Sequence, residues 1–91
     1  PKAIGEGETL DLIVGVGNYE KEKLAYAIYI NIDGKNTMIV GPLKLGPGEN
    51  WEKRLKVPIL ARPGRRMVEL RLMREGITPA YRNLYFWMDV K

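Results

Sequence analysis

Apolar and polar residues alternate at period two along most of this sequence, and Pro-Gly or Asp-Gly pairs interrupt the alternation at short intervals. Successive side chains of a β-strand point to opposite faces of its sheet, so each alternating segment predicts a strand with one buried face. No window combines the three- and four-residue apolar spacing of a helix with capping residues. The predicted strands cover residues 9–16, 24–32, 38–45 with an interruption at Gly41-Pro42, 51–57, 67–74 and 81–90.

The connections between these segments have the residues that tight turns need. Asp33-Gly34 predicts a hairpin turn, because both residues tolerate a positive φ. Pro47-Gly48 occupies the two central positions of a type II turn, and Pro63-Gly64 predicts another turn. Pro58 cannot donate a ladder hydrogen bond, so the strand over residues 51–57 should end, bulge or lie at an edge there. Residues 75–79 are expected to form a loop.

Short strands separated by frequent turns predict an all-β chain, folded as a two-sheet antiparallel sandwich of about six to eight strands. A small barrel is the alternative, and the length of 91 residues favours the sandwich. The whole of residues 1–91 is expected to form a single domain. Truncating Phe86 to alanine is expected to cost about 3–5 kcal/mol if its face is packed. The predicted core comprises Leu12, Val14, Ile28, Ile30, Leu70, Leu72, Phe86 and Met88.

Composition argues against an enzyme. The chain has no His, Cys or Ser, which removes the usual general base, thiolate chemistry and the nucleophile of the familiar triads. No catalytic residue, metal site or cofactor is predicted. The segment 31–36 places its Gly in the fourth position and no Glu closes a calcium loop, so it predicts a hairpin turn. Glu20 and Glu22 alternate with lysines, as is typical of a solvated loop.

Positive charge is concentrated in the second half of the chain. Residues 1–50 carry a net charge of −2 and residues 51–91 a net charge of +6, and every arginine lies in the second half. Such a basic face could meet anionic lipid or nucleic acid, but no nucleic-acid-binding motif accompanies it, so nucleic acid is an unlikely partner. The charge-rich composition without Gln or Cys is also typical of thermophiles.

Aromatic residues offer a second kind of surface. Tyr85 and Trp87 lie two apart on one predicted strand, so their rings share a face, as a sugar-stacking platform requires. The same spacing suits packing against the other sheet or against a protein partner, which is the expected arrangement. Trp51 opens a strand and is expected to be at least partly buried. The candidate interaction surface comprises Trp87, Tyr85, Arg65, Arg66, Tyr19 and Glu20.

The sequence begins with Pro1, which leads us to expect a piece of a longer protein. Its longest apolar segment, residues 24–32, is half the length that spans a bilayer, and residues 1–8 lack the apolar region of a signal peptide. The domain itself is therefore expected to be soluble, whether or not the parent chain is membrane-anchored.

Several segments together resemble an uncharacterised archaeal membrane-protein family, the domain of unknown function family numbered 1616. The resemblance implies transmembrane helices followed by an extracytoplasmic immunoglobulin-like sandwich, and no catalytic residues. Family turns commonly have Asn-His-Glu where this chain has Asn18-Tyr19-Glu20, so no role of a histidine carries over. Asn18 can itself accept a hydrogen bond from the backbone two residues on. The segments are residues 4–8, 14–20, Tyr26, 45–52, 62–64, 70–72, 81–84 and 87–90.

The predicted function is therefore a non-catalytic accessory or interaction domain on the extracytoplasmic side of a membrane-anchored protein, with a protein or cell-envelope partner. The alternative is a carbohydrate-binding module that uses exposed aromatic residues. A basic surface for anionic lipid or nucleic acid is a third possibility. Fold-level likeness alone does not decide among them.

Overall fold

The computed structural model describes residues 2–5 and 7–91, with the side chains of residues 5, 7–76 and 82–91. Across these residues the chain forms strands and no helix, so no helix in this part of the chain is long and apolar enough to cross a membrane. The strands are β1 (Lys2–Ile4), β2 (Thr9–Gly17), β3 (Leu24–Ile32), β4 (Lys35–Leu45), β5 (Asn50–Pro58), β6 (Gly64–Arg74) and β7 (Ile77–Val90).

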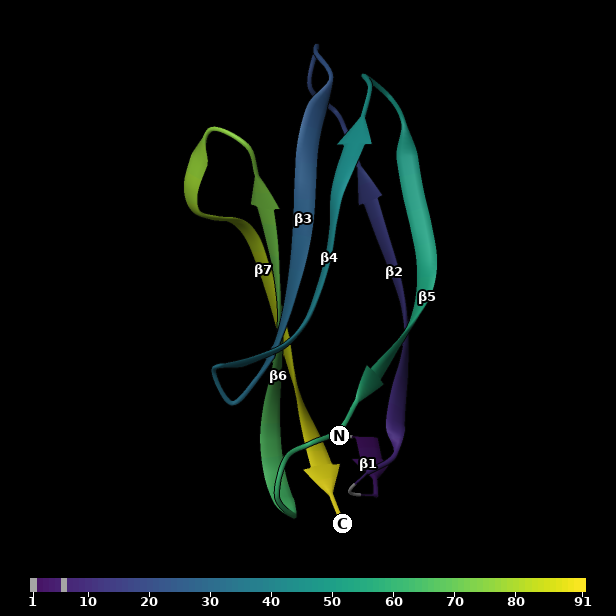
Figure 1. The fold of residues 1–91 in the computed structure, drawn as a ribbon, viewed down its shortest axis with the longest axis vertical. Helices are drawn as coiled ribbons and strands as arrows, with labels where there is room; N and C mark the ends of the chain where they lie inside the picture. Colours follow the sequence, from purple (N-terminus) through teal and green to yellow (C-terminus); the bar gives the residue numbers. More distant parts are fainter. Residues whose placement is uncertain (1, 6) are drawn as a thin grey trace.

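The strands form an immunoglobulin-like sandwich of two sheets, which confirms the predicted fold class (Figure 1). One sheet has five strands in the order β1-β7-β6-β3-β4, and the other pairs β2 with β5. The pairs are antiparallel except for β1, which runs parallel to β7 through Lys2↔Met88 and Ile4↔Val90. The sequence analysis did not foresee β1, since three residues are too few to show an alternation.

The core lies between the sheets and follows the predicted alternation. Ile28, Ile30 and Met88 of the predicted core are buried, and the other five members are half-buried against them. Four fully buried apolar residues were not in the predicted core: Leu10, Val57, Ile59 and Val68. Ile59 follows β5 and lies outside any alternating segment, so the pattern could not identify it.

The interruption expected at Gly41-Pro42 is a bulge within a longer strand. β4 already begins at Lys35, and its register against β3 shifts between Ile28↔Val40 and Tyr26↔Leu43, which leaves one extra residue on β4. The bulge needs glycine, since Gly41 has a φ of 130° and a Cβ there would lie 2.9 Å from the Tyr26 carbonyl oxygen. Pro42 is tolerated because β4 is an edge strand.

Two predicted turns and one predicted strand end agree with the structure. Asp33 and Gly34 connect the paired residues Ile32 and Lys35 and have positive φ values of 50° and 80°. Gly48 has a φ of 77°, and the Glu49 amide donates to the Gly46 carbonyl oxygen at 3.0 Å, as in a type II turn. β5 ends at Pro58, as expected.

The prediction of a loop over residues 75–79 is wrong. The chain turns at Glu75 and Gly76, and β7 begins at Ile77, which pairs with Arg74. The turn is tight because Gly76 adopts a φ of 80° and because the Glu75 side chain accepts a hydrogen bond from the Ala25 amide at 2.7 Å. Pro79 can lie in this strand because β1 pairs only with Met88–Val90, which leaves that part of β7 at an edge of the sheet.

Candidate functional site

Tyr85 and Trp87 lie on the outer face of the five-stranded sheet. Their neighbour Phe86 packs against the core, so the alternation of β7 turns both rings away from the second sheet. Tyr85 is 62% exposed and Trp87 is 44% exposed. The expectation that these rings pack against the second sheet is therefore wrong, and a partner outside the molecule stays a prediction. Trp51 is half-buried against the core, as expected.

Arg65 covers one side of the Trp87 ring. Its guanidinium carbon lies 5.2 Å from the ring centroid, within the range of a cation–π contact. Arg65 pairs with Asp89 across the β6–β7 ladder, two residues along the strands from the Met67↔Trp87 pair and on the same face. The arginine side chain is long enough to reach its diagonal neighbour across the two strands, so its charge lies over the indole ring of Trp87.

Further apolar side chains extend this surface across the sheet. Met67 is opposite Trp87 in the ladder, and Tyr29 of β3 is opposite Ile39 of β4. Met67 and Tyr29 are half-buried, and Ile39 is 56% exposed. We call the surface formed by Tyr29, Ile39, Arg65, Met67, Tyr85 and Trp87 the outer aromatic face. Ile39 and Met67 were not in the predicted interaction surface. The alternation of their strands places them on the face away from the core, and this signal could have identified them.

Arg66 lies next to Arg65 in the chain but points to the other side of the sheet. Its guanidinium donates to the carbonyl oxygens of Arg62 at 2.9 Å and Pro63 at 3.0 Å, and forms an ion pair with Asp33 at 3.3 Å. Asp33 also accepts a hydrogen bond from the Met67 amide at 3.0 Å. Arg66 therefore ties the β3–β4 turn to the connection between β5 and β6, and is not part of the outer aromatic face.

Tyr19 and Glu20 lie at the opposite end of the molecule from Arg65. Glu20 forms an ion pair with Arg74 at 2.7 Å, and Arg74 is the last residue of β6, whereas Arg65 is the second. These nine residue steps of extended chain correspond to roughly 30 Å. Tyr19 is 89% exposed in the turn after β2. The structure therefore brings together Arg65, Tyr85 and Trp87 of the predicted surface and separates Arg66, Tyr19 and Glu20 from them.

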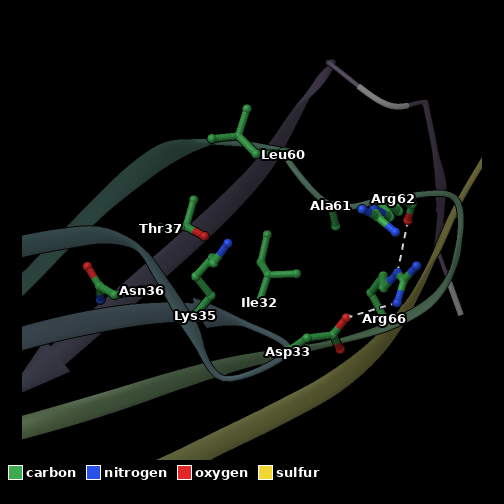
Figure 2. A pocket seen from close by; sticks show the side chains of 9 residues that line it. All are labelled: Ile32, Asp33, Lys35, Asn36, Thr37, Leu60, Ala61, Arg62 and Arg66. Atoms are coloured by element: carbon green, nitrogen blue, oxygen red, sulfur yellow. Dashed lines mark hydrogen bonds and ion pairs between the residues drawn. The ribbon is translucent and has the colours of Figure 1, made fainter.

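The sequence analysis also missed a pocket between the β3–β4 turn and the connection of β5 to β6 (Figure 2). Its volume is about 360 Å³. Ile32, Leu60 and Ala61 supply apolar surface, and Asn36 and Thr37 supply polar atoms. Four charged residues complete the lining: the basic Lys35, Arg62 and Arg66 and the acidic Asp33. We call this space the cationic pocket because three of the four are basic.

The described side chains include no group of three or more acidic residues arranged to hold a metal ion. Several carboxylates instead accept hydrogen bonds within turns: Glu8 accepts from the Gly5 amide at 2.8 Å, and Glu49 accepts from the Gly46 amide. These contacts close the turns that join strands, so the acidic residues concerned have structural roles. The side chain of Tyr81, another aromatic residue of the sequence, lies outside the described ones.

Comparison with known proteins relates the chain to a solved structure. No known protein family and no curated protein sequence matches this chain. A solution NMR structure of the CARDB domain of a protein from Pyrococcus furiosus matches it with a TM-score of 0.74 and 16% sequence identity. The match covers 99% of this chain and 86% of that domain. At this identity the likeness shows the fold alone, and the chain thus has the immunoglobulin-like fold of that CARDB domain.

Proposed function

We propose that this domain is a non-catalytic interaction module that binds another protein through its outer aromatic face. The observation that carries the proposal is the exposure of Tyr85 and Trp87 beside Arg65 on one sheet face. Interfaces are enriched in Tyr, Trp, Met and Arg at their centres, and this face combines all four. An exposed tryptophan that does not pack in the protein's own core often contributes a large part of the binding energy when a partner covers it.

The shape of the face also supports a protein partner. The face lies on β7, β6, β3 and β4 of one sheet, with Glu69 and Arg71 of β6 between the Met67–Trp87 pair and the Tyr29–Ile39 pair, so it is a broad sheet surface and not a narrow cleft. Backbone pairing within the five-stranded sheet holds the strands that carry these side chains in place before binding. Little backbone freedom therefore remains to be lost on association, which favours affinity.

A carbohydrate ligand is the second candidate. Tyr85 and Trp87 are exposed on the same face and are separated by two residues of extended strand, or roughly 7 Å, which could suit stacked sugar rings. Against this stands the guanidinium of Arg65, which covers one side of the Trp87 ring, so a sugar would have to use the other side or displace the arginine. The protein partner is therefore the favoured proposal.

The test compares the domain with a Tyr85→Ala/Trp87→Ala variant on a solid support exposed to a cell-envelope extract of the source organism. Tyr19→Ala is the matched control, because Tyr19 is exposed at 89% but lies away from the outer aromatic face. We expect a protein that the wild type and Tyr19→Ala retain and the double variant loses, and that binds the purified domain saturably.

Two results would contradict this proposal. One is that no protein distinguishes the double variant from the control. The other is saturable glycan binding, followed by Trp fluorescence and abolished by Trp87→Ala in a folded domain, which would establish the carbohydrate function instead.

We further propose that the domain works on the extracytoplasmic side of a membrane-anchored parent protein. The proposal rests on the resemblance of its strand and turn segments to the extracytoplasmic domains of the archaeal family numbered 1616, although no family model matches the chain. Protease added to intact cells should then digest the domain of the full-length protein. Digestion only after the cells are broken would contradict this location.

A further inference from the structure

The cationic pocket is held together before any ligand binds. The Asp33 amide donates to the Met67 carbonyl oxygen at 2.9 Å, and the Met67 amide donates back to the Asp33 carboxylate at 3.0 Å. These two bonds fix the β3–β4 turn on β6. Arg66 then connects that turn to the carbonyl oxygens of Arg62 and Pro63. Both walls of the pocket are thus fixed to β6, which reduces the cost of ordering them around a ligand.

Arg66 is occupied by its own hydrogen bonds and ion pair, so Lys35 and Arg62 are the basic residues of the pocket that can bind a ligand. Arg66 uses its guanidinium for Arg62, Pro63 and Asp33, so its positive charge is largely offset by the Asp33 carboxylate. Among the described residues, neither Lys35 nor Arg62 has an ion pair. Figure 2 shows Lys35 reaching into the pocket from the β4 side and Arg62 from the connection between β5 and β6.

The remaining lining is largely apolar. Ile32 is almost fully buried beneath the pocket, Ala61 is half-buried, and Leu60 is 79% exposed at its rim. An exposed leucine beside a buried isoleucine forms an apolar surface that a small aliphatic group can cover. The volume of about 360 Å³ lies at the small end of the range of ligand pockets, so the pocket suits a small molecule.

We propose that the cationic pocket binds a carboxylate carried on a small apolar body. The carboxylate would accept hydrogen bonds from the Arg62 guanidinium and the Lys35 ammonium, while the apolar body covers Leu60 and Ala61. Arginine matches the planar carboxylate with paired donors, and charge-assisted hydrogen bonds are the stronger kind. Asp33 is already paired with Arg66, so the positive charge that remains for the ligand carboxylate comes from Lys35 and Arg62.

The ligand carboxylate could come from a free small acid or from the carboxy-terminus of a polypeptide. N-acetyl-leucine is the probe for the first source, and the tripeptide Ala-Ala-Leu is the probe for the second. Binding is followed through the backbone amide NMR signals of residues 35–37 and 60–62. We expect saturable shifts confined to these residues with N-acetyl-leucine and weaker binding of acetate, which lacks the apolar body. Tighter binding of the tripeptide assigns the pocket to a polypeptide terminus, and tighter binding of N-acetyl-leucine assigns it to a free acid.

Matched variants separate the pocket from the general positive charge of the domain. Lys35→Gln and Arg62→Gln should each weaken binding of N-acetyl-leucine about fivefold or more. Lys44→Gln and Arg54→Gln change the net charge equally at exposed strand positions outside the pocket and should leave binding unchanged. Raising the salt concentration should also weaken binding, since the charged groups are partly exposed.

The proposal is overturned if N-acetyl-leucinamide, which lacks the negative charge, shifts the same signals as strongly as the acid. It is also overturned if the control variants weaken binding as much as the pocket variants, or if no probe shifts these signals. None of these results bears on the outer aromatic face, because the pocket and that face share no residue.

Discussion

At the scale of single residues, Asn18 shows how a buried polar side chain can organise a loop. It is fully buried, and its side-chain amide donates to the carbonyl oxygens of Leu45 at 2.7 Å and Glu22 at 2.9 Å. Its side-chain oxygen accepts from the Glu20 amide at 2.8 Å and from the Tyr26 hydroxyl at 3.2 Å. The hydrogen bond to Glu20 is the local contact that the sequence predicted, whereas the other three depend on the fold.

Replacing Asn18 by alanine should lower the free energy of unfolding by about 2–4 kcal/mol, because it leaves buried backbone carbonyls and the Tyr26 hydroxyl without their partner. Tyr26→Phe is the matched control and should cost about 1 kcal/mol, since it removes one hydrogen bond and keeps the packing. Denaturant titrations of both variants measure the difference. An Asn18→Ala domain as stable as the wild type would show that the loop is held by other contacts.

At the scale of the strands, β7 shows that alternation does not fix the degree of burial. Leu84, Phe86, Met88 and Val90 all point to the same side of the sheet, as predicted. Val90 and Met88 are 4% and 0% exposed, Phe86 is half-buried, and Leu84 is 64% exposed. The gradient arises because a sheet of only two strands lies opposite a sheet of five, so part of the inner face of the larger sheet lacks cover.

Alanine substitutions along β7 should follow this gradient. We expect Met88→Ala to cost about 3 kcal/mol, Phe86→Ala about 2 kcal/mol and Leu84→Ala less than about 0.5 kcal/mol. The value for Phe86 is lower than the sequence alone suggested, because its ring is only half-buried. Denaturant titrations give the three values. A loss at Leu84 as large as that at Met88 would mean that the inner face is covered there in solution.

At the scale of the whole molecule, carboxylates stabilise turns and join elements. Glu20 pairs with Arg74, Asp33 pairs with Arg66, and Glu75 accepts from the Ala25 amide. Each contact joins segments that are far apart in the sequence. Positive charge remains in excess, with a net charge of +4, so the molecule as a whole should not attract cations.

The thermal unfolding midpoint should therefore be the same with a chelator and with added calcium. Calcium needs six or more oxygen ligands, and the described side chains form no group of three acidic residues that could begin such a site. Differential scanning calorimetry of the domain in both conditions measures this. A rise of several degrees in the unfolding midpoint with calcium would contradict this prediction and reveal a calcium site. Magnesium at the same concentration controls for ionic strength.

The sequence by itself determined six of the seven described strands, most of the turns and the face of each of these strands that enters the core, because alternation and turn chemistry are local properties of the chain. It also placed Tyr85 and Trp87 on the face of the last strand opposite its core-facing residues, but only the structure showed that both rings are exposed and do not pack against the second sheet. Only the tertiary structure decided which arginine accompanies them. Arg65 and Arg66 are adjacent in sequence, yet the pleat of β6 sends one over the Trp87 ring and the other to the β3–β4 turn. The cationic pocket likewise depends on the pairing of distant strands, which brings Lys35 and Arg62 to one space.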